Sequence, residues 1–112
     1  MAQFTRGTTP DITIIIDAFD ARGMNSFVTI SQGATKILTL TGDRLEVTEA
    51  EDQGIYTTTI VLKLTQSETL KFRKGSAEIQ ARFIDAEENA FATEVGVISI
   101  NPVLDENVIE YE

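Results

Sequence analysis

Residues 55–64 read Ile-Tyr-Thr-Thr-Thr-Ile-Val-Leu-Lys-Leu and give the strongest indication of the fold class. In an extended chain, alternate positions from Tyr56 to Leu64 share one face, and Ile60 and Leu62 make that face apolar. The three consecutive threonines favour the extended form, because branching at Cβ restricts the first side-chain torsion. This segment is therefore predicted to be a β-strand with one face in the core.

The same alternation recurs along most of the chain, separated by turn residues such as Gly33 and Gly42. Further strands are predicted at residues 11–16, 26–32, 35–41, from 45 onward, 76–84 and 90–100. Residues 49–54 are expected to form a polar, acidic loop. The last strand has two open registers, with either Phe91, Val95 and Val97 or Ala92, Ile98 and Ile100 inward, and a bulge at Gly96 is one way to switch between them. About seven short strands predict an all-β fold, an antiparallel Ig-like β-sandwich; a small, partly open barrel is the alternative.

One segment departs from this period. Residues 65–68, Thr-Gln-Ser-Glu, have the form of a capping box, in which Thr65 and Glu68 close the first turn of a helix. Lys74 and Gly75 suit the end of a helix. One short helix is therefore predicted near residues 66–72, where it would close one end of the core.

The 112 residues suit a single domain. We expect a β-sandwich at residues 11–101, an N-terminal arm at 1–10 and an acidic, apolar C-terminal tail at 102–112. Apolar side chains on such ends either fold back onto their own domain or dock on another chain. The candidate partner-binding residues are Phe4, Arg6, Thr8, Thr9, Pro10, Val103, Leu104, Val108, Ile109 and Tyr111.

The composition argues against an enzyme. The chain has no cysteine and no histidine, so it lacks thiol nucleophiles, disulfides, the commonest general base and the commonest zinc ligand. No catalytic, cofactor-binding or metal-binding residue is predicted, and no cofactor is expected. The acidic segments 49–52 and 85–89 offer oxygen atoms of the kind that bind Ca²⁺ but lack the spacing of a calcium loop, so they are interpreted as solvated turns.

The formal net charge is -9, and all of this excess lies in residues 46–112. A negative surface repels phosphate groups, so the charge disfavours binding to nucleic acid or to an anionic membrane. No apolar run approaches the roughly 20 residues of a membrane span. A charged partner surface is expected to be basic.

Several motifs resemble one family of short proteins encoded in phages and prophages of Gram-positive bacteria. They are residues 4–10 (Phe-Thr-Arg-Gly-Thr-Thr-Pro), 28–33 (Val-Thr-Ile-Ser-Gln-Gly), 62–72 (Leu-Lys-Leu-Thr-Gln-Ser-Glu-Thr-Leu-Lys-Phe) and 103–109 (Val-Leu-Asp-Glu-Asn-Val-Ile). The match covers nearly the whole chain in order. The layout is also loosely similar to the N-terminal β-sandwich of phage upper baseplate proteins, although the long helical and fibre regions of those proteins are missing.

The resemblance implies a virion structural protein, made in the host cytoplasm, that sits on the capsid, neck or tail. Its expected partners are other virion subunits, with a homo-oligomer or a symmetric multi-copy assembly as the arrangement. It implies no catalytic residue. The alternative is a carbohydrate-binding or host-adhesion module of the particle, which would need an exposed aromatic platform. The chain has eight aromatic residues and no tryptophan.

Overall fold

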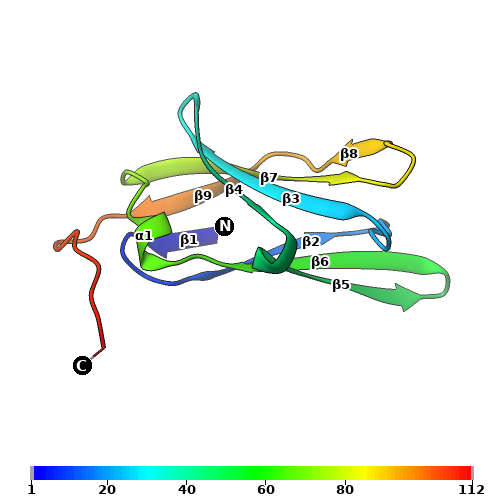
Figure 1. Cartoon of the computed structure of the whole chain (residues 1–112), viewed down its shortest axis with the longest axis horizontal. Coiled ribbons are helices and arrows are strands. Elements are labelled where there is room, and N and C mark those ends of the chain that lie inside the picture. The colour runs from blue at the N-terminus through cyan, green and yellow to red at the C-terminus, as the bar shows by residue number, and fades with distance from the viewer. Residues whose placement is uncertain (1, 112) are drawn as a thin grey trace.

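A computed structural model describes residues 2–111; Met1 and Glu112, the outermost residues of the predicted arm and tail, lie outside this range. Two β-sheets face each other as a sandwich (Figure 1). The elements are β1 (Ala2–Thr5), β2 (Asp11–Ile16), β3 (Asn25–Gln32), β4 (Thr35–Thr41), the 3-10 turn η1 (Gly42–Arg44), β5 (Leu45–Asp52), β6 (Ile55–Lys63), α1 (Gln66–Thr69), β7 (Gly75–Ile84), β8 (Ala90–Ala92) and β9 (Gly96–Asn101).

The larger sheet has the order β1-β9-β7-β3-β4, and β8 pairs with β7 beyond the end of β9. The smaller sheet has the order β2-β6-β5. Neighbouring strands are antiparallel, with the exception of β1, which runs parallel to β9. The predicted all-β sandwich with one short α-helix is confirmed.

The core lies between the two sheets and follows the alternation of the sequence. On β6, Thr58, Ile60 and Leu62 are fully buried, whereas Thr57 and Thr59 on the other face are partly exposed. The facing strands of the larger sheet contribute Val28, Ile30, Ala77, Ile79, Ala81, Phe83, Ile98 and Ile100. Period-two patterning therefore identified the inward face of β6 correctly, and the same alternation of buried and exposed residues holds on β3 and β7.

Three predicted boundaries were wrong. Residues 49–52 continue β5 opposite β6, so the expected acidic loop shrinks to the turn at Gln53 and Gly54. The helix ends at Thr69 instead of extending to residue 72. The last strand is two strands, because residues 93–95 leave the sheet between β8 and β9, and Gly96 begins β9 rather than forming a bulge within one strand.

The predicted capping box at α1 is confirmed. The Thr65 hydroxyl accepts a hydrogen bond from the Glu68 backbone N–H at 3.2 Å, and the Glu68 carboxylate accepts one from the Thr65 backbone N–H at 2.8 Å. Arg44 of η1 donates two hydrogen bonds to the same carboxylate, at 2.6 and 2.9 Å. These two bonds lower the pKa of Glu68 below its ordinary value.

Glu68→Gln is expected to make stability less dependent on pH. Because the pKa of Glu68 is lower in the folded than in the unfolded chain, the stabilisation is present above the ordinary value near 4.5 and is lost as the pH falls through the folded value. Urea unfolding should therefore show the variant to be less stable at neutral pH, with a difference that narrows in acid. The control is Glu78→Gln on an exposed position of β7. A Glu68→Gln deficit that stays constant below pH 4.5 would contradict the role of this carboxylate.

Candidate functional site

The predicted N-terminal arm lies on the body of its own domain. Its first residues form β1, which adds to the edge of the larger sheet beside β9. Phe4 is buried in the core, where its ring meets that of Phe72 edge-on at 5.6 Å between centroids. The Arg6 guanidinium donates to the carbonyl oxygen of Leu70 at 3.1 Å and forms an ion pair with Glu106.

The Gly-Thr-Thr part of the motif is fastened to α1 through one buried hydroxyl. Thr69 accepts a hydrogen bond from the Gly7 backbone N–H and donates one to the Thr8 carbonyl oxygen, both at 2.9 Å. Gly7 has φ +78°, a backbone conformation that favours glycine. Pro10 accepts from the Leu64 backbone N–H at 3.1 Å, and Thr8 and Thr9 are exposed. In the single chain, this motif therefore connects β1 to β2; contact of these residues with a partner stays a prediction.

The C-terminal tail is held at two points and displays its apolar side chains to solvent. The Gln66 side chain donates to the Ile109 carbonyl oxygen at 3.0 Å and accepts from the Ile109 backbone N–H at 2.8 Å. The Arg6–Glu106 ion pair is the second point. Leu104 and Tyr111 are fully exposed, and Ile109 is 69% exposed.

Within the tail, Val103 lies closest to the body. It is partly buried, and its nearer methyl carbon would lie 3.8 Å from a Cβ built on Gly7. Val108 is half exposed. Of the five predicted partner-binding residues in the tail, four therefore present large apolar surfaces that the chain itself does not cover.

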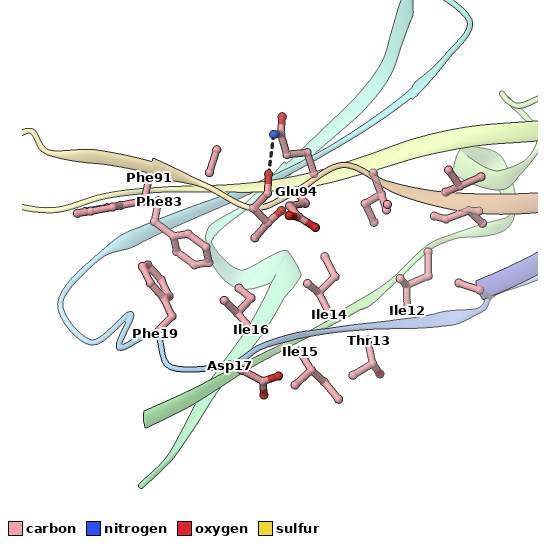
Figure 2. A pocket seen from close by; sticks show the side chains of 18 residues that line it. Ile12, Thr13, Ile14, Ile15, Ile16, Asp17, Phe19, Phe83, Phe91 and Glu94 are labelled. Atoms are coloured by element: carbon pink, nitrogen blue, oxygen red, sulfur yellow. Dashed lines mark hydrogen bonds between the residues drawn. The ribbon is translucent and has the colours of Figure 1, made fainter. Parts of the chain in front are cut away.

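An open, apolar groove runs between the two sheets along β2 and has a volume of about 600 Å³. Figure 2 shows Ile12, Ile14 and Ile16 pointing from β2 toward the larger sheet. Thr13, Ile15 and Asp17 alternate with them and point away from the groove. The period-two pattern of β2 therefore gives the groove an apolar floor, and the acids Asp17 and Glu94 are among the residues that line it.

Three phenylalanines form the end of the groove near the turn after β2. The Phe19 ring lies 4.8 Å from that of Phe83 and 5.8 Å from that of Phe91, measured between centroids. Phe91 is 42% exposed although it sits opposite Phe83 in the β7–β8 register. An aromatic side chain that faces inward and still meets solvent indicates that the sandwich is open at this place.

Strand edges border the groove. β2 pairs with β6 along one edge, and no strand within residues 2–111 pairs with the other. In the larger sheet, β1 covers β9 only from Ile98 onward, which leaves Gly96 and Val97 without a β1 partner. Uncovered strand edges accept an added strand from another chain, because their backbone donors and acceptors point outward.

Charge is distributed unevenly between the two ends of the long axis. The three loops at the right in Figure 1 form the acidic end, which we define as residues 17–24, 49–54 and 85–89. They hold the acids Asp17, Asp20, Glu49, Glu51, Asp52, Asp85, Glu87 and Glu88. Their cation, Arg22, donates hydrogen bonds to Asp20 at 2.8 to 3.1 Å and lowers the pKa of that carboxyl.

The opposite end carries α1, the tail and the segment 70–75 (Figure 1). We define Lys71, Arg73 and Lys74 of this segment as the basic end; all three are exposed, and the segment holds no acid. Arg73 is fixed by Gln32, whose side chain accepts from the Arg73 backbone N–H and donates to its carbonyl oxygen, both at 2.7 Å. Glu68 of α1 and the acids Asp105, Glu106 and Glu110 of the tail lie at this same end, so it carries charges of both signs, whereas the acidic end is mainly negative.

Carboxylates in the acidic loops accept hydrogen bonds from backbone N–H groups of their own loops. Asp85 accepts hydrogen bonds from the backbone N–H groups of Glu87 and Asn89 at 2.9 Å, and these bonds, that of Asn89 foremost, lower the pKa of Asp85. Glu51 accepts from the Gly54 backbone N–H at 2.8 Å. Across residues 2–111, no three acidic side chains gather in a way that could hold a metal ion. Nor does the described chain contain a helix long and apolar enough to cross a membrane.

The sequence left open whether the tail folds back onto its own domain or stays exposed, and the groove was not predicted from it. The groove depends on one edge of β2 and the start of β9 having no partner strand. This follows from the order of the strands in the two sheets and not from the hydrophobic pattern of any one strand. The local signal was the segment Thr93-Glu94-Val95, which interrupts the expected last strand. The interruption is fixed to β7: the Thr93 backbone N–H donates to the Ala81 carbonyl oxygen at 2.9 Å, and the Gln80 side chain donates to the Thr93 carbonyl oxygen at 2.8 Å.

Comparison with known families finds no family that matches this sequence, and none of the curated proteins matches it. Among solved structures, the chain is similar to AggA from Escherichia coli, the major subunit of aggregative adherence fimbriae type I. The TM-score is 0.39 and the sequence identity 10%, over 92% of this chain and 91% of that one. A likeness of this size carries no inference about function.

Proposed function

We propose that this protein is a structural subunit of a phage particle, on its capsid, neck or tail, and that it acts by docking to neighbouring protein subunits. The observation on which the proposal depends is the pairing of two uncovered apolar features on one small sandwich: the groove along β2 and the exposed tail. Apolar surfaces of this kind on a rigid β-scaffold are typical of protein–protein contacts.

The proposed location on a phage particle is based on the sequence resemblance to short phage and prophage proteins. Its motifs at residues 4–10 and 62–72 are in contact with each other through Thr69 and the Phe4–Phe72 ring pair. These two motifs therefore build one junction, at the end of the molecule from which the tail leaves (Figure 1). This junction fits a subunit that presents its tail in a fixed direction.

The test is mass spectrometry of purified particles together with a variant that lacks residues 103–112. We expect the chain to be present in particles and the deletion variant to be absent from them while remaining folded, because the tail contributes little to the core. A matched control is Asp105→Asn with Glu110→Gln, which keeps every apolar side chain of the tail and should still be incorporated. Retention of the deletion variant in particles would refute docking through the tail.

A deletion of residues 1–10 does not provide an equivalent test, because it removes β1 and takes Phe4 out of the core. A screen against a glycan array separates docking from the carbohydrate-binding alternative. Clear glycan hits, together with incorporation into particles that does not need residues 103–112, would favour a host-adhesion module of the particle and overturn the proposal.

A further inference from the structure

We propose that an open cavity beside Arg6 binds a small phosphate dianion, and that this ligand takes the place of the Glu106 carboxylate. The cavity has a volume of about 550 Å³ and lies between the N-terminal arm, the basic end and the tail. Its lining consists of Arg6, Arg73, Lys74, Pro102 and Glu106. The inference goes beyond the proposed docking function and does not depend on it.

The lining of this cavity is positively charged, although the chain as a whole has a net charge of -9. Glu106 is the one acid among the lining residues, and it pairs with Arg6. Within residues 2–111, neither Arg73 nor Lys74 forms an ion pair. Three cations and one acid leave an excess of two positive charges, which rises to three when the Glu106 carboxylate is displaced.

The other acids at this end of the molecule do not fill the cavity. The Glu68 carboxylate accepts its two hydrogen bonds from Arg44. Asp105 accepts from the backbone N–H and the side-chain amide of Asn107, at 2.9 and 2.8 Å. Neither of these acids lines the cavity, and nor does Glu110. They weaken the positive potential there but leave the three lining cations available to a ligand.

Arg6 has a donor that the chain does not use. Its side chain is 16% exposed, and a guanidinium carries five N–H donors in a fixed planar arrangement. Nη2 donates to the Leu70 carbonyl oxygen and Nη1 to Glu106, whereas the buried Nε has no hydrogen-bond partner within residues 2–111. Phosphate has more acceptor oxygens than a carboxylate, and arginine binds such groups through two donors at once.

Glu106 is an occupant that a ligand can displace. Its side chain is 63% exposed, and an ion pair with so solvated a partner contributes little to stability. A carboxylate carries one negative charge, whereas a phosphate monoester carries about 1.5 to 2 at neutral pH. Phosphate therefore gains more from three cations than Glu106 loses, whereas a monocarboxylate would only exchange one carboxylate for another.

The charge of the whole molecule restricts the ligand to a small one. A net charge of -9 repels a polyanion, and each phosphate of a nucleic acid carries a single negative charge. The expected ligands are therefore inorganic phosphate and the phosphate monoester of a small molecule.

Phosphate binding is coupled to the tail, because the ligand and Glu106 compete for Arg6. Displacement of Glu106 removes one of the two anchors of the tail and leaves the contacts between Gln66 and Ile109 as the other. Coupling between two binding events is reciprocal. A change that weakens the pairing of Glu106 with Arg6 must therefore strengthen the binding of phosphate.

The experiment is isothermal titration calorimetry of the full chain with inorganic phosphate, at constant ionic strength and slightly alkaline pH. The loss variant is Arg73→Gln with Lys74→Gln, both exposed positions, and the gain variant is Glu106→Gln. The control is Arg82→Gln, which removes an exposed cation of β7 that does not line the cavity. We expect binding to be at least about tenfold weaker in the loss variant and unchanged in the control. In the gain variant it should be about two- to sixfold tighter, as expected when an exposed ion pair no longer competes.

Two further ligands test the chemistry of the site. Acetate at the same ionic strength should bind at least about tenfold more weakly than phosphate, because it carries one charge. Glycerol phosphate distinguishes the two sources of the phosphate group. Binding at least as tight as that of inorganic phosphate shows that the cavity accepts the group as part of a larger molecule, and rejection shows that free phosphate is the ligand; both outcomes support the site.

The tail gives an independent measurement. NMR order parameters of the Glu106 and Asn107 amides should fall when phosphate binds to the unchanged chain, and they should already be low in Glu106→Gln. Circular dichroism shows that each variant is folded. The inference would be overturned by an absence of phosphate binding in both the unchanged chain and Glu106→Gln, by an affinity that the loss variant leaves unchanged, or by weaker binding in Glu106→Gln.

Discussion

Phe72→Ala is expected to lower the free energy of unfolding by about 3–5 kcal/mol, the usual cost of truncating a buried phenylalanine. The Phe72 side chain is 1% exposed and meets the Phe4 ring edge-on at 5.6 Å. The substitution removes apolar contacts, leaves a cavity and takes from Phe4 its aromatic neighbour. Since small domains are stable by only about 5–15 kcal/mol, the loss is a large share of the total. Urea unfolding followed by circular dichroism measures it.

Phe91→Ala is the matched control because it deletes the same atoms from a partly exposed position. Phe91 is 42% exposed on the rim of the groove, so water already covers part of its ring. We expect a loss of about 1 kcal/mol, because the cost of truncation scales with the area removed from water. Equal losses for the two variants would show that the end of the core around β1 and α1 is no better packed than the open groove.

Thr69→Val is expected to lower the free energy of unfolding by about 2–4 kcal/mol. Valine nearly preserves the shape of threonine but cannot replace its hydroxyl. The Gly7 backbone N–H and the Thr8 carbonyl oxygen would lose their partner at a position that is fully buried. An unsatisfied polar group in such a place costs about 1–3 kcal/mol.

Thr69→Ser separates the hydroxyl from the methyl group. Serine keeps both hydrogen bonds and loses one buried methyl group, so its loss should be nearer 1 kcal/mol. Amide hydrogen exchange gives a local measurement: the Gly7 amide should exchange faster in Thr69→Val and stay protected in Thr69→Ser. A valine variant as stable as the serine variant would mean that the hydroxyl does not hold the N-terminal loop.

The parts of the fold that sequence predicted are those determined by local physics. β2 and β4 begin and end where alternation and turn residues place them, and the Thr65–Glu68 capping box forms as its spacing predicts. The acidic segment 49–52 was misjudged because charge suggested a loop. In the structure, exposed acids on β5 are compatible with a strand, since this strand is the edge of its sheet and one of its faces is solvated.

The candidate site was predicted only in part, for a reason that concerns distance along the chain. The sequence marked Leu104, Ile109 and Tyr111 as apolar residues on a tail but left open whether they fold back onto the domain, and the structure shows them exposed. The burial of Phe4 depends on β1 pairing with β9, and the groove depends on β2 lacking a second neighbour. Neither the β1–β9 pairing nor the missing neighbour of β2 can be recognised from the residues of the strands concerned.

The parallel pairing of β1 with β9 also determines the order in which the molecule assembles. Residues 2–5 meet residues 98–101, so this contact closes a loop that contains nearly all of the polypeptide. The entropy lost in closing so long a loop is recovered only after the intervening hairpins have already shortened the path. We therefore expect docking of the first strand to be a late event in folding, with Phe4 among the last large side chains to leave water.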